Sequence, residues 1–262
     1  MTTTFRELLK KDGPVLGLYL QSADPFVVEA AKTGGFDFIR IDNEHILYDY
    51  SQIKELIRVA ILLDLPCQVR VADLTDVTRM LDAGATGIVV PDVNTVARAR
   101  EAVRVAKYAP VGARGMYPLP PPTGRFLRAA GFDNFADYVK EANEIVTLTV
   151  QIEDIGATPF LDEIIAMPGV DMIASGKADI SQSVGKPGQT TAPEVVEFEK
   201  LLIRKALEHG KTPTLMAGMN PAFVREMMGL GVKIFSCGPD EAVIANAFRS
   251  FVKEMTEDGG GR

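Results

Sequence analysis

The stretch GFDFIRIDNEH, residues 35–45, carries the pattern that decides the fold. Its centre, residues 38–42, is a short and mostly apolar run with aromatic and β-branched side chains, which is typical of a buried strand. The polar residues Asn43, Glu44 and His45 follow at once. Because the active site of a parallel α/β fold lies beyond the carboxyl ends of the strands, this stretch predicts both a strand and part of a site.

The same succession repeats along the chain. Short apolar runs alternate with stretches of helical spacing, which is the pattern of βα units around a parallel sheet. Strands are expected at residues 15–20, 38–42, 67–71, 87–91, 145–153, 170–175, 212–217 and 233–238. Helices are expected at residues 25–32, 50–62, 74–82, 96–106, 135–143, 192–208, 221–228 and 241–255. These eight strands predict a closed (β/α)8 TIM barrel, because an open doubly wound sheet usually has about five or six.

The length and composition fit one globular domain. The chain has 262 residues, of which 47% are hydrophobic and 24% charged, and a TIM barrel takes about 250 residues. We expect the barrel domain at residues 1–256 and a disordered tail with three consecutive glycines at 257–262. Cys67 and Cys237 lack the spacing of a zinc site and are expected to be buried and reduced.

The charge pattern bears on partners and location. The net charge is −7 at pH 7 without a basic tract, which argues against a nucleic-acid partner because phosphate binding relies on clustered Lys and Arg. The opening residues lack the apolar core of a signal peptide, and no apolar run reaches the roughly 18 residues that span a membrane. The sequence therefore predicts a cytoplasmic protein.

One connection is too long for a plain βα loop. Residues 108–134 contain four glycines and a cluster of prolines at 118 and 120–122. A long loop in a compact domain is usually functional or involved in assembly. We therefore expect this segment, and residues 118–126 above all, to shape a pocket or a subunit contact.

Polar residues close several of the expected strands. They are Asp42, Glu44 and His45 after the second strand, Arg70 in the third, Gln151 and Glu153 in the fifth, and Ser175, Gly176 and Asp179 in and after the sixth. The carboxyl ends of all the strands meet at one end of a barrel. These side chains are therefore expected to surround one mouth.

His45 is the candidate acid or base of this mouth. It lies just beyond a strand beside two carboxylates, where an imidazole can exchange protons near neutral pH. The alternative is a solvated loop histidine. His209, which precedes Gly210 near a helix end, is expected at the surface.

Glu153 and Asp179 are the candidate metal ligands. A hard divalent cation prefers carboxylate oxygens together with water or substrate oxygens. The alternative is that each carboxylate caps the helix that follows it.

Arg70 is the candidate anion-binding residue, because a buried guanidinium must be paired or must face an anionic ligand. The alternative is an internal ion pair with Asp42 or Glu44. Gly176 allows a close approach of the backbone, so neighbouring N–H groups could receive a carboxylate.

Several ordered motifs together resemble the HpcH/HpaI family of class II, metal-dependent pyruvate aldolases, such as 4-hydroxy-2-oxoheptanedioate and 2-dehydro-3-deoxy-sugar-acid aldolases. They are GFDFIRIDNEH at 35–45, VRV at 69–71, LDAGATGI at 81–88, PVGARG at 110–115, VQIE at 150–153, and PGVD at 168–171 followed by DIS at 179–181. The resemblance covers nearly the whole chain. It implies a TIM barrel of the phosphoenolpyruvate/pyruvate type that cleaves a 4-hydroxy-2-oxo acid to pyruvate, or a related 2-oxo acid, and an aldehyde.

The resemblance also implies roles for the residues. Glu153 and Asp179 would hold Mg²⁺, Mn²⁺ or Co²⁺, His45 would act as the base, and Arg70 would steady the enolate oxygen. Gln151, Ser175, Gly176, Ala178 and Asp179 would bind the substrate, Asp82 would raise the basicity of the histidine, and Asp42 and Glu44 would support the site. Because Asp82 falls at the end of an expected helix, near the opposite face, it would act in a neighbouring subunit or be structural. Lys177 and Ala178 stand where proline and asparagine are expected in relatives.

Three rival functions remain open at this stage. Lys177 is the candidate for a Schiff-base aldolase on the same fold. A synthase, lyase or decarboxylase acting on another 2-oxo acid would use the same metal-bound enolate. The third rival is a binding or scaffold protein that retains the barrel without catalysis.

The C-terminal segment bears on assembly. Relatives form hexamers as trimers of dimers that exchange a C-terminal helix, so the resemblance implies a homo-oligomer, trimer or hexamer. Residues 241–255 carry an apolar stripe that could do the same; it consists of Val243, Ala247, Phe248, Phe251 and Val252. The alternative is that the stripe packs on its own barrel.

Overall fold

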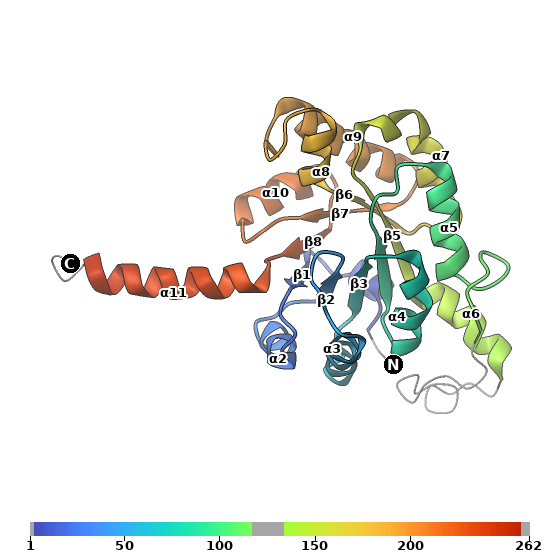
Figure 1. The fold of residues 1–262 in the computed structure, drawn as a ribbon, viewed down its shortest axis with the longest axis horizontal. Helices are drawn as coiled ribbons and strands as arrows, with labels where there is room; N and C mark the ends of the chain where they lie inside the picture. Colours follow the sequence, from blue (N-terminus) through green and yellow to red (C-terminus); the bar gives the residue numbers. More distant parts are fainter. Residues whose placement is uncertain (1–2, 117–133, 258–262) are drawn as a thin grey trace.

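The computed structural model describes residues 3–116 and 134–257, and these residues form one closed barrel (Figure 1). Each strand pairs in parallel with the next along the chain, and β8 pairs with β1. The strands are β1 (Val15–Leu20), β2 (Phe38–Asn43), β3 (Cys67–Val71), β4 (Gly87–Val90), β5 (Thr147–Ile152), β6 (Met172–Ser175), β7 (Thr212–Met216) and β8 (Ile234–Cys237). The predicted TIM barrel is confirmed. The proline-rich stretch at 118–126 and the tail from residue 258 lie outside the described residues.

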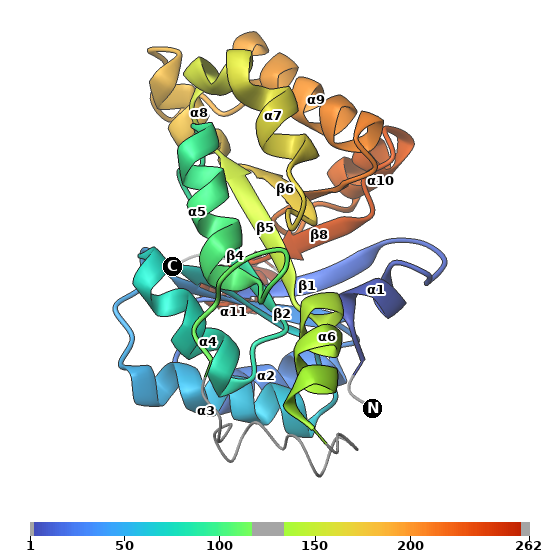
Figure 2. The same cartoon turned by 90° about the vertical axis from the view of Figure 1, so that its right-hand side faces the viewer.

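Helices cover the outside of the barrel, except that α1 packs at its end and α11 extends away from it (Figures 1 and 2). They are α1 (Phe5–Leu8), α2 (Pro25–Thr33), α3 (Tyr50–Leu62), α4 (Val77–Ala83), α5 (Val96–Ala106), α6 (Phe135–Ile145), α7 (Leu161–Ala166), α8 (Lys177–Ser183), α9 (Pro193–Glu208), α10 (Pro221–Gly229) and α11 (Asp240–Glu257), with 3₁₀ turns η1 (Leu74–Asp76) and η2 (Ile155–Phe160). Asp24 and Asn220 cap the starts of α2 and α10 with their side chains, and each of these helices begins with a proline.

Three short helices are not predicted by the sequence. The helices α1, α7 and α8 have four, six and seven residues. Segments of two turns or fewer do not complete enough periods of apolar spacing to be recognised. The fifth strand also starts later than expected, since residue 145 still belongs to α6. At the other end of the chain, Glu257 belongs to α11 and not to a tail.

The amino-terminal end of the barrel is filled by aromatic side chains. Phe5 of α1 is fully buried and meets Phe38 of β2 edge to face, with 5.1 Å between the ring centroids. Val15, Met172 and Ile234 belong to the same apolar cluster. The helix α1 thus closes the end of the barrel opposite to the predicted site.

The barrel interior just below the site is polar. Side chains alternate along a strand, so Arg40 and Asp42 of β2 face the same side. The guanidinium of Arg40 donates from Nε and Nη2 to Gln68 Oε1, at 3.0 and 2.8 Å, and from Nη2 to Thr214 Oγ1 at 3.3 Å. TIM-barrel interiors are usually filled by branched apolar residues, so a buried arginine at this level is unusual.

The last helix, α11, extends away from the barrel (Figure 1). Its start is fixed because the Asp240 carboxylate accepts the backbone N–H groups of Gln21 and Ser22, at 2.8 and 3.1 Å. Large apolar side chains along it are exposed: Ile244, Phe248, Phe251, Val252 and Met255. The expected stripe is therefore not packed on its own barrel within the described residues.

Two further expectations concern the cysteines and the membrane. Cys67 and Cys237 are buried and free, as expected. Burial raises the pKa of both thiols, that of Cys237 to about 11. Within residues 3–116 and 134–257, no helix combines the length and the hydropathy that crossing a bilayer would demand.

Candidate active site

A cavity of about 280 Å³ opens among the carboxyl ends of the strands. Its lining consists of Tyr19, Arg40, His45, Arg70, Gln151, Glu153, Ser175, Gly176, Lys177, Ala178, Asp179, Glu199 and Met216. Eight predicted site residues are among them, and they come from the ends of β2, β3, β5 and β6 and from the start of α8. The predicted mouth of the barrel is thus a real cavity, and Asp42 and Glu44 lie directly beside it through their contacts with Arg70.

Arg70 joins two carboxylates at one wall of the cavity. Its Nη2 lies 2.9 Å from Asp42 Oδ1 and its Nη1 lies 3.1 Å from Glu44 Oε2. The Tyr19 hydroxyl also bonds to this guanidinium. Both ion pairs that the sequence left as an alternative are therefore present, and Arg70 still lines the cavity. The planar fork, held on one edge by Asp42, is fixed in orientation.

Burial and the ion pairs shift the pKa values of Asp42, Arg70 and Glu44 in opposite directions. Burial alone would raise the pKa of Asp42, but Arg70 and the hydrogen bond from Tyr19 outweigh it and hold the pKa below its ordinary value. Burial disfavours the charged form of Arg70, yet the negative charge around it raises its pKa. For Glu44 burial prevails over Arg70 and raises the pKa. Asp42 is thus the firmly ionised partner of Arg70.

His45 stands at the outer rim. Its side chain is 60% exposed, and Nε2 lies 3.7 Å from Glu44 Oε2. The turn that carries it is fixed by Asp42, whose Oδ1 accepts the backbone N–H of Glu44 at 3.1 Å and that of His45 at 3.4 Å. An imidazole in this position can reach a molecule in the cavity and exchange protons with water.

Glu153 follows the end of β5 and is buried in the cavity wall. Its Oε2 accepts the backbone N–H of Asp92 at 2.7 Å, and its Oε1 accepts the side-chain amide of Gln151. A Cβ at Gly176 would lie 2.1 Å from Glu153 Oε1, so only glycine leaves room for this carboxylate. Burial raises the pKa of Glu153, and the nearby charge of Asp179 adds to the rise.

Glu153 and Asp179 fit a divalent metal better than the helix-cap alternative. It is Asp154, not Glu153, that caps η2, and α8 has no side-chain cap. Two carboxylates close enough to repel each other are an oxygen donor pair that a hard cation would neutralise. Within the described ranges no three His, Cys, Asp or Glu side chains gather as a complete protein cage. Mg²⁺ is usually bound by one or two carboxylates with water and substrate oxygens.

A buried polar network lies across the cavity from Arg70. The Ser175 hydroxyl donates to Glu199 Oε1 at 2.7 Å, and Lys177 Nζ lies 2.6 Å from Glu199 Oε2 and 4.9 Å above the Phe223 ring. Schiff-base formation requires a neutral amine. An ammonium paired to a buried carboxylate is the opposite arrangement, so the geometry disfavours Lys177 as the nucleophile.

Asp82 lies away from this cavity in its own chain. The helix α4 ends at Ala83 and is capped by Gly84, which turns the chain with φ of 109°, in the left-handed region that favours glycine. Because helices run antiparallel to the strands, the last turn of α4 lies toward the amino-terminal end of the barrel. There Asp82 pairs with Arg114. A catalytic role for Asp82 would therefore have to be played in the site of another subunit.

Sequence reasoning missed four of the lining residues: Tyr19, Arg40, Glu199 and Met216. Arg40 had a usable signal, since it lies two residues before Asp42 on the same strand and therefore faces the same side. Glu199 had none, because it belongs to the long helix α9 and its burial depends on packing against β6.

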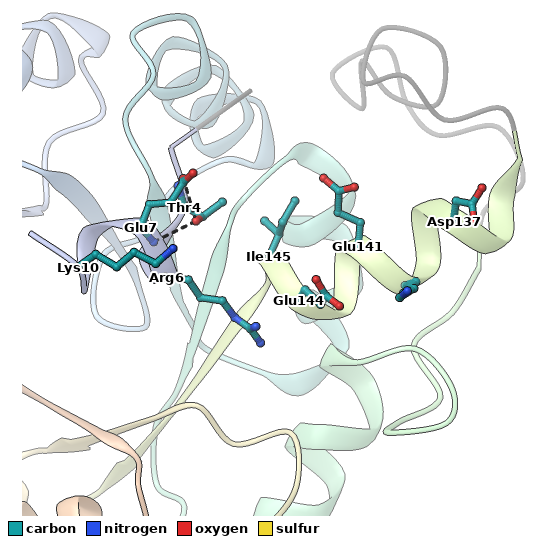
Figure 3. A pocket seen from close by; sticks show the side chains of 9 residues that line it. Thr4, Arg6, Glu7, Lys10, Asp137, Glu141, Glu144 and Ile145 are labelled. Atoms are coloured by element: carbon teal, nitrogen blue, oxygen red, sulfur yellow. Dashed lines mark hydrogen bonds between the residues drawn. The ribbon is translucent and has the colours of Figure 1, made fainter.

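A second, larger hollow has a different character. It measures about 520 Å³ and lies between α1 and α6, as Figure 3 shows. Charged side chains of both signs line it, among them Arg6, Lys10, Glu141 and Glu144. It is remote from the carboxyl ends of the strands, so size alone does not identify the site, and the smaller cavity remains the candidate.

Comparison with known proteins agrees with this site. Residues 15–247 match the family described as HpcH/HpaI aldolase/citrate lyase. The chain is similar to a hydroxypyruvate/pyruvate aldolase of Agrobacterium fabrum, with 32% identity over 250 residues that cover 94% of this chain and 91% of the relative. It is also similar to a 4-hydroxy-2-oxo-heptane-1,7-dioate aldolase of Escherichia coli, with 30% identity over 251 residues that cover 94% and 92% of the two chains.

Comparison with solved structures indicates the same family. The chain matches the crystal structure of an HpcH/HpaI aldolase from Desulfitobacterium hafniense with a TM-score of 0.86 and 29% identity, covering 96% of each chain. The resemblance drawn from the sequence motifs is thereby confirmed. The chain belongs to the HpcH/HpaI aldolase/citrate lyase family of carbon–carbon lyases.

Proposed function

We propose that the chain is a divalent-metal-dependent aldolase that reversibly cleaves a 4-hydroxy-2-oxo acid to pyruvate, or a related 2-oxo acid, and an aldehyde. The observation that carries the proposal is the set of charged groups that line one cavity: two carboxylates that influence each other, Glu153 and Asp179, a fixed guanidinium, Arg70, and an exposed imidazole, His45. The names of the two similar aldolases support the reaction type.

Glu153 and Asp179 would hold Mg²⁺, Mn²⁺ or Co²⁺. When bound, such a cation supplies Lewis-acid polarisation of a 2-oxo group. Gln151 orients Glu153 through its amide, and Gly176 keeps the space into which the carboxylate projects. Ser175 and the backbone at Ala178, in the first turn of α8, would contact the substrate.

Arg70 would stabilise the negative charge that develops on the 2-oxo oxygen as the C–C bond breaks. It is suited to this because Asp42 fixes its orientation before the substrate arrives, and preorganised donors cost no rearrangement during the reaction. Glu44 and Tyr19 complete its surroundings.

His45 would take the proton from the 4-hydroxyl group, from which the aldehyde forms. With His45 at the rim, the aldehyde end of the substrate would lie toward the opening and the 2-oxo acid end deeper in the cavity. Asp82, if it has a catalytic role, would exercise it on the histidine of a neighbouring subunit.

The test is pyruvate release from a panel of 4-hydroxy-2-oxo acids, before and after chelation and metal replacement. We expect activity to vanish with chelator and to return with Mn²⁺ or Mg²⁺. Activity that survives exhaustive metal removal and is trapped by borohydride with substrate would assign the reaction to a lysine. Condensation without measurable cleavage would instead assign it to a synthase.

A matched pair of variants tests the role of the histidine. His45→Gln should lower kcat by about 100-fold or more, the usual contribution of a general acid or base. His209→Gln serves as the control, since His209 pairs with Asp162 on the outside of the molecule. Equal activity of His45→Gln and wild type would favour a binding or scaffold protein that retains the barrel without catalysis.

We further propose a cytoplasmic homo-oligomer, trimer or hexamer, with small-molecule substrates and neither nucleic acid nor membrane as a partner. The support for assembly is α11, which extends from the barrel with Phe248 and Phe251 about two-thirds exposed. Exposed apolar area of this kind is typical of a subunit contact. A second copy of the chain, offering the same helix, is the occupant we expect.

A further inference from the structure

One carboxylate lies on the buried face of α9. The buried residues of this helix follow the three- and four-residue spacing of a single face: Val195, Phe198, Glu199, Leu202, Ile203 and Ala206. All of them except Glu199 are apolar, and Glu199 is only 3% exposed. A buried charge is costly unless it is paired and hydrogen-bonded. Glu199 therefore needs polar partners, and residues that line the cavity supply them.

Both carboxylate oxygens of Glu199 contact the segment that leads into α8. Oε1 accepts the Ser175 hydroxyl at 2.7 Å, and Oε2 lies 2.6 Å from Lys177 Nζ. The Lys177 ammonium also lies 4.9 Å from the centroid of the Phe223 ring, within the range of a cation–π contact. The ammonium is therefore held by one residue of α9 and one of α10.

The two candidate metal ligands lie close to the same lysine. Gly176 directly precedes Lys177, and a Cβ at Gly176 would lie 2.1 Å from Glu153 Oε1. Asp179 comes two residues after Lys177, in the first turn of α8. Lys177, Glu153 and Asp179 all line one cavity. Because lysine carries its charge on a flexible four-carbon stem, its ammonium can be attracted to any of the neighbouring carboxylates.

An ammonium on the metal ligands would oppose metal binding. It would occupy carboxylate oxygens that a divalent cation needs, and its positive charge would repel the cation. In the structure the ammonium is placed on Glu199 instead. Among the described residues, the hydrogen-bond donors to Glu153 are neutral N–H groups, from the backbone of Asp92 and the side chain of Gln151.

We propose that Glu199 is a positioning residue that holds Lys177 away from Glu153 and Asp179 and balances its charge, so that both carboxylates stay available to the metal. This inference rests on the proposed metal-dependent function. Glu199 acts through Lys177 and not on the metal itself. The effect of losing Glu199 therefore depends on whether Lys177 is present.

The experiment measures Mn²⁺ affinity by calorimetry, together with stability in urea. Glu199→Gln keeps the shape of the side chain and an oxygen that accepts the Ser175 hydroxyl, but it removes the charge that holds Lys177. We expect its Mn²⁺ affinity to fall by about 10- to 100-fold, the usual effect of changing a residue that supports the metal ligands. An unchanged affinity would overturn the inference.

A second substitution separates this role from damage to the fold. Lys177→Met removes the ammonium and keeps an unbranched side chain. In the double variant Glu199→Gln/Lys177→Met no ammonium remains at this position to compete with the metal, so Mn²⁺ affinity should return to near the wild-type value. If the double variant binds Mn²⁺ as weakly as Glu199→Gln does, Glu199 supports the site only structurally and the inference is overturned.

Glu197→Gln is the matched control. Glu197 lies two residues before Glu199 on α9, pairs with Lys200, and has a side chain that is 70% exposed. Its replacement changes the net charge by the same amount outside the cavity lining. Mn²⁺ affinity should equal that of wild type. A loss as large as that of Glu199→Gln would mean that net charge alone sets the affinity, and would exclude a specific role for Glu199.

The outcomes separate the inference from the function beneath it. If wild type binds no Mn²⁺, the proposal of a metal-dependent aldolase fails. If wild type binds Mn²⁺ and Glu199→Gln binds it equally well, only the role of Glu199 fails. Should Glu199→Gln not fold, Lys177→Met alone decides the question. Its Mn²⁺ affinity should be no lower than that of wild type, and a loss of about 10-fold or more would show that the ion pair itself builds the site.

Discussion

Asp42 Oδ1 lies 2.9 Å from Nε of Arg70, at directly paired positions of β2 and β3. The same oxygen accepts the backbone N–H groups of the turn that carries His45. One buried carboxylate therefore positions both a cation and an imidazole. The contribution of the Asp42 charge can be tested separately from catalysis by measuring the free energy of unfolding.

Asp42→Asn should reduce the free energy of unfolding by about 3 kcal/mol, since it removes the buried carboxylate of the ion pair and leaves Arg70 with the more exposed Glu44. Asn keeps the shape and an acceptor oxygen, so the loss reports the charge. Urea denaturation is the measurement. Asp12→Asn at an exposed position should change stability by less than about 0.5 kcal/mol; an equally small effect at Asp42 would contradict the prediction.

The stability contributed by Asp42 should depend on pH. Its pKa in the folded protein is below its ordinary value of 3.8, so the unfolded chain takes up the proton first as the solution is acidified. The contribution is complete above the ordinary value and is lost as pH falls through the folded pKa. The difference in unfolding free energy between wild type and Asp42→Asn should thus be smaller at about pH 3 than at about pH 6. A difference that stays constant over this interval would refute the assignment.

Gly176→Ala should disable the metal site. The added Cβ would lie 2.1 Å from Glu153 Oε1, so the carboxylate must move. We expect activity to fall by about 100-fold, as for a displacement of about 1 Å in a catalytic site, and Mn²⁺ affinity measured by calorimetry to fall with it. Gly229→Ala has no atom within 4 Å of the new Cβ and is the control. Unchanged Mn²⁺ affinity in Gly176→Ala would mean that Glu153 is not a ligand.

Phe251→Glu should weaken assembly. The side chain is 66% exposed on α11, and a charge there opposes burial against a second copy. Light scattering after size exclusion should show smaller particles than wild type. Ser250→Glu adds the same charge at the neighbouring exposed position and should have a weaker effect. A wild-type protein that is already monomeric would remove the basis of the assembly proposal.

The strands could be predicted because most of them are continuous buried runs, and several end in polar residues, as at Asp42 or Glu153. The bounds agree to within a residue or two for most of them. Short helices escaped because α1 and α8 are too brief for a periodic pattern. What α1 does, filling the barrel with Phe5, depends on a contact across 33 residues of chain, from position 5 to position 38, that local spacing does not reveal.

The site was predictable where chemistry follows a strand end, as at His45 and Asp179. It was not predictable where a helix far along the chain supplies the partner, as Glu199 does for Lys177. Arg40 shows a third case. Its polarity inside an apolar run was visible, but its neutral hydrogen-bond partners among the described residues, Gln68 and Thr214, could be recognised only after β3 and β7 were placed beside it.

The packing of Phe5 against Phe38 bears on the order in which substrates bind and products leave. Because these rings close the amino-terminal end of the barrel, we expect substrates and products to enter and leave through the same opening at the carboxyl ends of the strands. The 2-oxo acid, which lies deeper in the proposed function, must then bind first and leave last. Product inhibition should accordingly be ordered, with the aldehyde escaping before the oxo acid.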